Sequence, residues 1–365
     1  METIIITTAV VTGFTGILAI LLTLADRTIA NYGEKKLVIN EDREYIVKGG
    51  STLLSALIEE KIFIPSACGG KGTCGYCKVK VLEGGGQVLP TELTWLTEEE
   101  LKNSMRLSCQ CKIKEDMKIY IPEELFNVRE YEATVELIED MTSVIKKVRL
   151  RLSEGAEIDF KPGQYIQLKI PAYDGNDEED YRAYSIASSP HDKNHIDLYI
   201  GYTGGTATTY VHKFLKEGDK VYINGPYGDF YYHDNRDKEM ILVAVGTGIA
   251  PILSILHYMA ENEIDRKATF YFGARTPDDL FELDLIKYFE EKIPNFKFIP
   301  TLSRVTEEHK WTGARGRVNV HLEKDIENAD NKEAYLCGSP AMIDTVVELL
   351  KKKGFTDENI FYDKF

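Results

Sequence analysis

The feature that most constrains this chain is a cluster of five cysteines between positions 68 and 111, out of six in its 365 residues. Five residues separate Cys68 from Cys74, two separate Cys74 from Cys77, and Cys109 follows later. Four thiolates are the ligands that a [2Fe–2S] cluster requires. Glycines lie between the first three cysteines and permit the positive φ angles of a loop that curls tightly around such a cluster. The pattern predicts a [2Fe–2S] centre held by Cys68, Cys74, Cys77 and Cys109.

Chemistry alone leaves other interpretations of this cluster open. Cys111 lies as near as Cys109 and could supply the fourth thiolate; we choose Cys109 and expect Cys111 to be a free thiol. A zinc site is the main competitor, although zinc loops usually come as paired short knuckles. Unrelated structural cysteines are a further alternative. A disulfide framework is not expected, because it belongs to small secreted domains and this chain is large.

The N-terminus is the most apolar part of the chain. Residues 3–25 carry no charge, and as a helix they would extend roughly 33 Å at about 1.5 Å per residue. Only Glu2 precedes this run, whereas a cleaved signal peptide carries positive charge there. Basic residues, the first of them Arg27, follow it and favour the cytoplasm for the rest of the chain. We predict an uncleaved transmembrane helix that anchors residues 1–27 in the bilayer; a cleaved signal and a buried core helix are the alternatives.

Charge and length narrow the remaining classes of protein. The net charge is −15, so the surface repels phosphate backbones and nucleic-acid binding is not expected. The length is sufficient for two or three domains. After the anchor, changes in hydrophobic pattern divide the chain into predicted domains at residues 34–127, 129–234 and 235–365.

The first of these domains contains the cysteine loop. Two short strands, Lys36–Asn40 and Glu44–Lys48, are expected before a helix that Ser51 caps. A strand at Lys78–Glu83 follows the loop, and Thr97 begins a second helix with acidic residues in its first turn. The pattern therefore mixes strands and helices around the loop.

The second domain is predicted to be rich in strands. Short strands are expected at regular spacing, at Glu132–Ile138, Val144–Leu152, Tyr165–Ile170, Arg182–Ala187, Ile196–Thr203 and Lys220–Asn224. One helix, Thr206–Leu215, interrupts them. This spacing is typical of an antiparallel barrel or sandwich.

Two motifs in the second domain suggest a flavin nucleotide. Arg182 can pair with a phosphate, the Tyr184 ring can lie against an isoalloxazine, and the Ser185 hydroxyl can hydrogen-bond near its N5. A turn before the predicted helix supplies amides and hydroxyls that suit a pyrophosphate, from Gly205, Thr206, Thr208 and Thr209. Each of these signals alone is weak, since an arginine in a strand is usually a solvated side chain. Their order and spacing together resemble the ferredoxin–NADP reductase superfamily.

The third domain alternates strands with helices, which predicts a parallel, doubly wound sheet. Strands are expected at Met240–Val245, Ala268–Phe272, Phe296–Leu302 and Tyr335–Cys337. Helices are expected from the glycine turn to about Glu261, at Leu280–Glu291 and at Ala341–Lys353.

The turn after the first of these strands predicts a nucleotide site. Gly246, Thr247 and Gly248 open a helix, with Pro251 in place of the third glycine of the full dinucleotide fingerprint. The motif is a moderate signal by itself.

The end of the next strand bears on which nucleotide binds. Arg275 lies where the adenosine ribose would be, and the carboxylates Asp278, Asp279 and Glu282 follow closely. Carboxylates there would repel a 2′-phosphate, which favours NADH over NADPH. The alternative is that these acids cap the following helix.

The order of anchor, cysteine loop, flavin barrel and nucleotide sheet resembles, over essentially the whole chain, the F subunit of the bacterial sodium-translocating NADH:quinone reductase. Besides the cysteine loop, the segments that carry the resemblance are Arg106–Gln110, Arg182–Ser185, Trp311–Gly313 and Asp363–Phe365. It implies a multidomain chain with an α+β β-grasp ferredoxin domain, an antiparallel β-barrel FAD domain and a Rossmann-like α/β NAD domain. The implied cofactors are non-covalent FAD and one [2Fe–2S] cluster, with NADH as substrate.

The superfamily resemblance also implies roles near the C-terminus. Cys337 and Gly338 match a Cys-Gly-x-Pro-x-Met motif in which the cysteine lies beside the nicotinamide. A terminal aromatic such as Phe365 often covers the flavin until the nicotinamide displaces it. With Ser185, Cys337 and Phe365 are the predicted catalytic residues. The alternatives are a cysteine that packs in the core and an unstructured terminal phenylalanine.

A flavin is needed because NADH gives two electrons as hydride and a [2Fe–2S] cluster takes only one. We expect hydride transfer from NADH to FAD, then single electrons to the cluster, in the electron-input subunit of a Na⁺-translocating membrane NADH:quinone reductase. The partners would be membrane redox subunits, and the location the bacterial cytoplasmic membrane with the soluble domains in the cytoplasm. The main alternative is a membrane-tethered NADH-dependent reductase that feeds an oxygenase or another redox partner, because the stretch between Pro171 and Arg182 is as short as in such reductases. A non-enzymatic ferredoxin-like carrier is the third.

Overall fold

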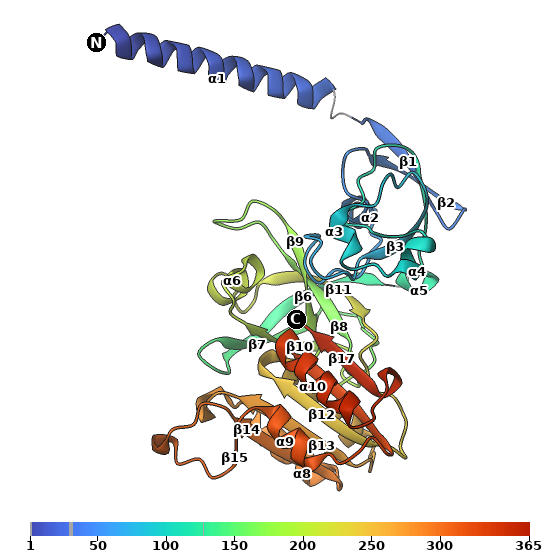
Figure 1. Cartoon of the computed structure of the whole chain (residues 1–365), viewed down its shortest axis with the longest axis vertical. Helices are drawn as coiled ribbons and strands as arrows, with labels where there is room; N and C mark the ends of the chain where they lie inside the picture. Colours follow the sequence, from blue (N-terminus) through green and yellow to red (C-terminus); the bar gives the residue numbers. More distant parts are fainter. Residues whose placement is uncertain (1, 29–31, 127) are drawn as a thin grey trace. The chain divides into compact units, whose positions relative to one another are not determined.

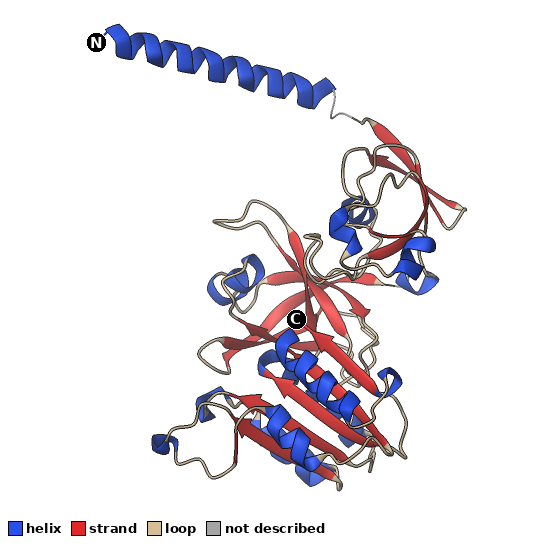
Figure 2. Cartoon of the chain, in the orientation of Figure 1, coloured by secondary structure: helices blue, strands red, loops and turns tan. Residues whose placement is uncertain are grey.

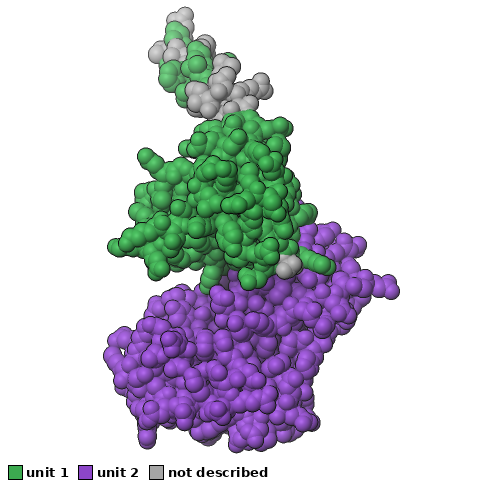
Figure 3. All heavy atoms as spheres, turned by 90° about the vertical axis from the view of Figure 1, so that its right-hand side faces the viewer, with its two compact units in different colours: residues 1–129 green, residues 130–365 purple. Residues whose placement is uncertain are grey.

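The computed structural model describes residues 2–28, 32–126 and 128–365, although the side chains of residues 2–5, 9–10 and 22–28 lie outside the description. The chain begins with helix α1 (Glu2–Thr28) and forms two compact units, residues 1–129 and 130–365 (Figures 1 and 3). Among the described residues, none of the helices combines the length and the apolar character that crossing a bilayer requires. The anchor predicted at residues 1–27 is therefore not confirmed, and its first residue, Met1, lies outside the described residues, as does Asn127.

The first unit contains a mixed five-stranded sheet wrapped against short helices (Figure 2). Its strands are β1 (Glu34–Ile39), β2 (Arg43–Lys48), β3 (Lys78–Glu83), β4 (Met105–Leu107) and β5 (Met117–Tyr120). Its helices after α1 are α2 (Leu53–Glu59), α3 (Pro90–Leu93), α4 (Glu98–Lys102) and α5 (Glu123–Phe126). The strand order is β2-β1-β5-β3-β4, with β1 and β5 parallel and the other pairs antiparallel. This is the β-grasp arrangement that the resemblance implied.

The helix caps of this unit are set by hydroxyl side chains. Thr97 accepts a hydrogen bond from the Glu100 amide, and the Glu100 carboxylate accepts one from the Thr97 amide, which confirms the second predicted cap. At α2 the prediction was wrong by one residue. Thr52 caps the helix by accepting from the Ser55 amide, while the Ser51 hydroxyl donates to the Lys48 carbonyl. Two adjacent hydroxyl residues offer equivalent caps, and sequence alone does not separate them.

The second unit begins with a six-stranded barrel. Its strands are β6 (Arg129–Asp140), β7 (Ile145–Leu152), β8 (Tyr165–Ile170), β9 (Asp180–Ser185), β10 (His195–Gly201) and β11 (Lys220–Tyr227). The order is β10-β7-β6-β11-β8-β9, and an antiparallel bridge between Ile186 and Leu198 joins the two outer strands. Helix α6 (Thr206–Lys213) packs Ala207 and Val211 into the barrel core. The structure thus decides for a barrel rather than a sandwich.

A parallel six-stranded sheet follows, flanked by helices on both faces (Figure 2). Its strands are β12 (Glu239–Val245), β13 (Ala268–Ala274), β14 (Phe296–Leu302), β15 (Ala314–Arg315), β16 (Lys332–Gly338) and β17 (Ile360–Lys364). Its helices are α7 (Ile249–Glu261), α8 (Leu283–Lys292), α9 (Val318–Asp325) and α10 (Pro340–Lys352). Short 3₁₀ turns complete it, at η1 (Gly246–Gly248), η2 (Pro277–Asp279), η3 (Glu307–His309) and η4 (Asp357–Asn359).

The order of the sheet, β15-β14-β13-β12-β16-β17, is that of a doubly wound domain, and every strand pair in it is parallel. Side chains from α7 and α8 share one hydrophobic core with the sheet, and side chains from α9 and α10 share another with it. Since the carboxyl ends of parallel strands meet at one edge, the loops after β12, β13, β14 and β16 are gathered there.

A buried ion pair fastens the connection between barrel and sheet. The Arg266 guanidinium donates to the Glu333 carboxylate at 2.8 Å and to the His233 carbonyl at 2.9 Å. Asn235 and Lys238 donate to the other oxygen of Glu333, at 2.6 and 3.2 Å. Both partners of the ion pair are almost wholly buried. The connecting segment is therefore bound to the sheet at several points.

Candidate functional site

The four predicted cluster ligands meet as two thiol pairs. The Cys68 and Cys74 side chains hydrogen-bond to each other, and so do those of Cys77 and Cys109. The bond from Cys74 lowers the pKa of Cys68 to about 4, and the bond from Cys77 lowers the pKa of Cys109 to about 7. Cys111 is buried, and its thiol instead donates to the Gly85 carbonyl at 3.6 Å.

This arrangement in pairs bears on the kind of metal. Over the described parts of the chain, no three or more His, Cys, Asp or Glu side chains are grouped to hold an ion. A structural zinc ion takes all four ligands at a single tetrahedral centre, whereas the two irons of a [2Fe–2S] cluster share four protein ligands between them. Two pairs of thiols match the number and grouping of ligands that a two-iron cluster takes.

The loop that carries three of these thiols depends on its glycines. Gly72 and Gly75 both have a φ of +72°. A Cβ at Gly75 would lie 2.9 Å from the Trp95 ring, and a Cβ at Gly72 would lie 2.6 Å from the Gln110 side chain. The Trp95 indole also donates to the Gly72 carbonyl at 3.0 Å. The loop can close around a cluster only where there are no side chains at these positions.

A buried ion pair braces the segment that leads to Cys109. Arg106 donates twice to Glu92, at 2.9 and 2.7 Å, and also to the carbonyls of Gly85, Gly86 and Gln87. Glu92 accepts a further bond from the Leu107 amide at 3.0 Å. The pair joins the glycine turn after β3 to β4, close to the fourth ligand. Sequence reasoning used Arg106 in a motif but missed Glu92, because Glu92 lies in the four-residue helix α3, which is too short to give a periodic pattern.

The predicted flavin motif lies at the end of β9. Arg182 and Tyr184 are two residues apart and therefore share one face of the strand, while Ser185 lies on the other. All three side chains are half-buried. Arg182 pairs with Asp180 and donates to the Tyr181 carbonyl at 3.0 Å. The guanidinium predicted to bind a flavin phosphate is thus already next to a carboxylate, a partner that sequence reasoning did not identify.

The second flavin motif forms the start of α6. Gly205 occupies the N-cap, and Thr206 and Thr209 lie in the first turn. The Thr208 hydroxyl accepts from the Thr203 amide and donates to the Gly205 carbonyl, both at 3.2 Å. The helix start remains partly exposed, so its amides could receive a pyrophosphate.

The predicted nucleotide turn lies where barrel and sheet meet. Gly246, Thr247 and Gly248 form η1 between β12 and α7, and Pro251 is buried in the first turn of α7. A Cβ at Gly248 would lie 2.3 Å from the Cys337 carbonyl oxygen, which is why only glycine fits there. The Thr247 methyl group lies 3.4 Å from the Cβ position of Gly201, the last residue of β10. The turn is thus held against the barrel.

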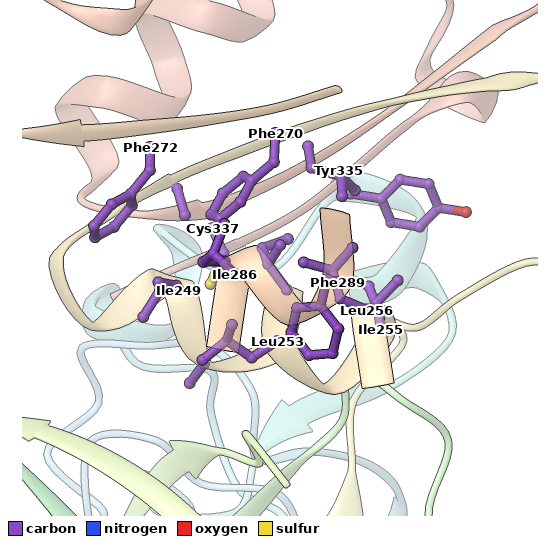
Figure 4. Packing of buried hydrophobic residues seen from close by; sticks show 14 of the residues in the cluster. Ile249, Leu253, Ile255, Leu256, Phe270, Phe272, Ile286, Phe289, Tyr335 and Cys337 are labelled. Atoms are coloured by element: carbon purple, nitrogen blue, oxygen red, sulfur yellow. The ribbon is translucent and has the colours of Figure 1, made fainter. Parts of the chain in front are cut away.

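The two predicted catalytic residues near the C-terminus, Cys337 and Phe365, differ in their burial. Cys337 has 0% exposure and packs among residues of α7 and α8 (Figure 4), and burial raises its pKa well above the ordinary value. A contact between its sulfur and a nicotinamide would therefore need neighbouring groups to move. Phe365 is 55% exposed, and its amide donates to the Gly338 carbonyl at 3.2 Å. Strand β17, which pairs with β16, thus places Phe365 at the carboxyl end of β16.

Two of the three carboxylates after Arg275 are already engaged. Asp279 accepts from the Thr276 amide at 2.9 Å and hydroxyl at 3.0 Å, so the capping alternative is correct for it. Glu282 accepts from Lys147 at 2.8 Å and from the Tyr199 hydroxyl. Glu282 is thus paired with a cation, whereas Asp279 is a cap that keeps its negative charge. The preference for NADH over NADPH stays a prediction.

The contact of Glu282 belongs to a network that sequence reasoning missed. Lys147 on β7 lies between Glu282 of the sheet domain, at 2.8 Å, and Asp197 of the barrel, at 3.7 Å. Arg149 pairs with Asp197 through two bonds of 2.7 Å. The Lys147, Asp197 and Glu282 side chains are mostly buried, so the network forms a clasp between the two domains. No local pattern could indicate it, since Lys147 and Glu282 are 135 positions apart in the sequence.

Comparisons with known proteins agree with this geometry. The model of the 2Fe-2S iron-sulfur cluster binding domain matches residues 38–114, that of the oxidoreductase FAD-binding domain residues 132–232, and that of the oxidoreductase NAD-binding domain residues 242–348. The chain is thus an oxidoreductase that joins a [2Fe–2S] ferredoxin domain to a flavin- and nicotinamide-nucleotide-binding reductase.

Curated relatives identify the family. The chain is 35% identical to the F subunit of the Na(+)-translocating NADH-quinone reductase of Neisseria meningitidis, with 96% of both chains covered. It is 37% identical to the F subunit of the same reductase of Methylococcus capsulatus, with 91% of this chain and 92% of that one covered. The chain belongs to the family of these F subunits.

Solved structures share the fold. The cytochrome P450 reductase GcoB of Amycolatopsis is 27% identical, with a TM-score of 0.72 over 91% of this chain and 98% of that one. The ferredoxin reductase in carbazole 1,9a-dioxygenase has a TM-score of 0.70 with the same coverage, at 24% identity. The ferredoxin reductase fold is therefore common to all three.

Proposed function

We propose that this chain is the electron-input subunit of a Na⁺-translocating NADH:quinone reductase in a bacterial cytoplasmic membrane. FAD would accept hydride from NADH, and a [2Fe–2S] cluster would carry the electrons onward one at a time. The observation that carries the proposal is the presence, in one chain, of two thiol pairs, formed by a glycine loop and Cys109, together with flavin and nucleotide turns. The functional domains would be residues 34–127, 129–234 and 235–365.

The thiol pairs would hold the cluster. Cys68 with Cys74, and Cys77 with Cys109, supply four sulfur ligands of the kind that iron–sulfur clusters use. Within each pair the shared hydrogen bond lowers the pKa of one thiol and raises that of the other, as expected for two sulfur atoms held close together. Exclusion of side chains at the loop glycines leaves room and directs backbone amides toward the sulfur atoms.

The barrel would bind FAD by its phosphates and its ring. Arg182 and the start of α6, with Gly205, Thr206, Thr208 and Thr209, would hold the phosphates. Tyr184 would lie against the ring, and Ser185 would hydrogen-bond near the reacting nitrogen. For a phosphate to pair with Arg182, the Asp180 carboxylate must give up part of its contact.

The carboxyl edge of the parallel sheet would bind NADH. Gly246, Thr247, Gly248 and Gly338 allow the dinucleotide to approach the backbone, Pro251 fixes the start of α7, and Arg275 lies by the adenosine half. Phe365 would cover the flavin until the nicotinamide displaces it. Cys337 would help to position the nicotinamide after its neighbours shift.

Helix α1 would hold the chain at the membrane, next to the other redox subunits of the complex. Residues 3–25 carry no charge. Apolar side chains all along its described part, such as Ile6, Phe14 and Ile20, are more than half exposed. With 27 residues, α1 extends roughly 40 Å at about 1.5 Å per residue, which suits a single-pass anchor with the remaining domains in the cytoplasm.

Absorbance spectra of the anaerobically purified chain, before and after addition of NADH, test the redox part of the proposal. Flavin and iron–sulfur bands should both be present, and both should bleach with NADH. A colourless or zinc-containing preparation would refute it. Copurification of the tagged chain from native membranes tests the assignment to the complex: multi-span membrane subunits with Na⁺-stimulated quinone reduction are expected, and recovery of a soluble oxygenase would favour the alternative reductase role.

A further inference from the structure

Four exposed arginines gather at one corner of the parallel sheet. Arg275 directly follows β13, Arg304 follows β14, Arg315 ends β15, and Arg317 precedes α9. They come from three separate loops, and they lie at the carboxyl edge of the sheet. The corner is the end of the sheet away from β16 and β17.

Backbone hydrogen bonds hold these loops close together. The Arg304 amide donates to the Arg275 carbonyl at 2.8 Å, and the Ser303 amide donates to the Ala274 carbonyl at 3.0 Å. Arg315 pairs in register with Leu302, two residues before Arg304. The backbone segments that carry the four arginines are therefore neighbours at this edge of the sheet.

These arginines are not neutralised by ion pairs. Among the described residues, which include all four, none of them has a carboxylate within salt-bridge distance, and Arg315 donates only to the Trp311 carbonyl at 2.9 Å. The acids nearest in sequence that are exposed are Asp278, Glu307 and Glu308, since Asp279 is committed to its cap. In a chain with 59 acidic and 44 basic residues, four unpaired arginines at one corner are a local reversal of charge.

The position of the corner indicates the ligand. In doubly wound sheets the adenosine ribose of a dinucleotide lies beyond the second strand of the binding half, where a carboxylate recognises the free 2′-hydroxyl and an arginine accommodates a 2′-phosphate. Here the carboxylate of Glu282 is paired with Lys147 and that of Asp279 caps the turn at Thr276, while the bond from the Arg304 amide to the Arg275 carbonyl brings both arginines to this edge. Guanidinium groups bind phosphate through paired charge-assisted hydrogen bonds.

We propose that the site also accepts nucleotides with a 2′-phosphate, that is NADPH besides NADH, with Arg304 as the main phosphate contact. The inference rests on the proposed function, because it concerns the adenosine end of the same nucleotide site. The hydride donor and the transfer to flavin are unchanged; only recognition of the ribose differs.

The first test of this proposal measures the binding of nucleotides that cannot transfer hydride. Calorimetry on the oxidised holoprotein compares 2′,5′-ADP with 5′-AMP, which differ only in the 2′-phosphate. The first should bind about tenfold more tightly at low salt, the effect of one charge-assisted hydrogen bond, and salt should reduce the difference. Arg304→Gln should abolish the preference, whereas Arg151→Gln, which changes an exposed arginine on the barrel strand β7, should retain it.

Anaerobic flavin reduction is the second measurement. The ratio of kcat/KM for NADPH to that for NADH should fall about tenfold in Arg304→Gln and stay constant in Arg151→Gln. Equal affinity for 2′,5′-ADP and 5′-AMP, with NADH reducing the flavin and NADPH failing to do so, would overturn the inference and leave the proposed function intact. Failure of both nucleotides to reduce the flavin would instead refute the proposed function.

Discussion

Replacement of Glu92 by glutamine should destabilise the ferredoxin domain selectively. The Glu92 side chain is 0% exposed and that of Arg106 is 6% exposed, and the pair forms two hydrogen bonds. Glutamine has nearly the same shape but no charge, so the Arg106 cation would stay buried without a counter-ion. Removal of one partner of a buried ion pair costs about 3–5 kcal/mol. That is a large share of the roughly 5–15 kcal/mol that stabilises a whole domain.

Urea unfolding of the holoprotein measures this effect with two signals. Visible absorbance of the iron–sulfur centre reports on the first unit, and flavin fluorescence reports on the second. With a urea dependence of about 2 kcal/mol per molar, the loss should lower the midpoint of the absorbance transition by about 1.5–2.5 M. The flavin transition should not move. The matched control is Glu83→Gln, because Glu83 pairs with Lys118 at 2.6 Å on the surface, where the two side chains are 62% and 49% exposed. It should cost less than about 1 kcal/mol.

The pH dependence adds an independent check. Burial by itself would raise the pKa of Glu92, but hydrogen bonds from Arg106 and two backbone amides outweigh it and hold the pKa below the ordinary 4.5. A carboxyl whose pKa is depressed by folding stabilises the fold above its ordinary pKa and loses this contribution as the pH falls through the depressed value. Below pH 4.5 the wild type should therefore lose stability more steeply than Glu92→Gln. A midpoint in Glu92→Gln no lower than in Glu83→Gln would refute the reasoning.

Three further substitutions address the redox path. Cys74→Ser should remove the iron–sulfur absorbance while NADH still reduces the flavin; wild-type iron content in this variant would argue against Cys74 as a ligand. Cys337→Ala should slow flavin reduction in stopped flow while cluster content stays intact, and an unchanged rate would remove the role of Cys337. Lys147→Met should slow flavin reduction about tenfold at unchanged FAD content, because the clasp to Glu282 no longer holds sheet and barrel in register. Lys146→Met, at the neighbouring position paired with exposed Asp140, is its control, and equal rates in the two variants would contradict the clasp.

Helices and strands with a clear hydrophobic pattern were predictable from the sequence. The bounds of β3, β8 and β14 agree with the prediction at both ends, because each is a run of alternating or continuous apolar residues between turn signals. Strands β4, β5, β15 and β17 were missed. Strands β4, β5 and β15 have only two to four residues, too few for a period. Strand β17 forms because β16 offers an edge, a tertiary condition that no local pattern contains.

In the candidate site, too, the local features were predictable from the sequence and the tertiary contacts were not. The cysteine spacing and the glycine turns indicated which residues are candidates, since ligand type and backbone freedom are local properties. The partners in tertiary contacts were not predictable. Lys147 against Glu282 and Glu92 under Arg106 depend on how segments apart in the sequence meet. Asp180 lies two residues before Arg182 on the same face of β9, so strand alternation could have indicated that pair. The partner of Glu282 bears on one expectation, because a carboxylate that was expected to repel a 2′-phosphate is paired with Lys147.

The segment tied down by Arg266 and Glu333 has a consequence for how such reductases can be recombined. A splice between barrel and sheet near position 234 would leave the Arg266–Glu333 pair intact but remove the His233 carbonyl that accepts from Arg266, so the new partner would have to place a carbonyl there. Position 129, at the start of β6, is where the two compact units divide. In chimeric reductases, the flavin and nucleotide domains should therefore be kept together, and the ferredoxin domain should be the part that is exchanged.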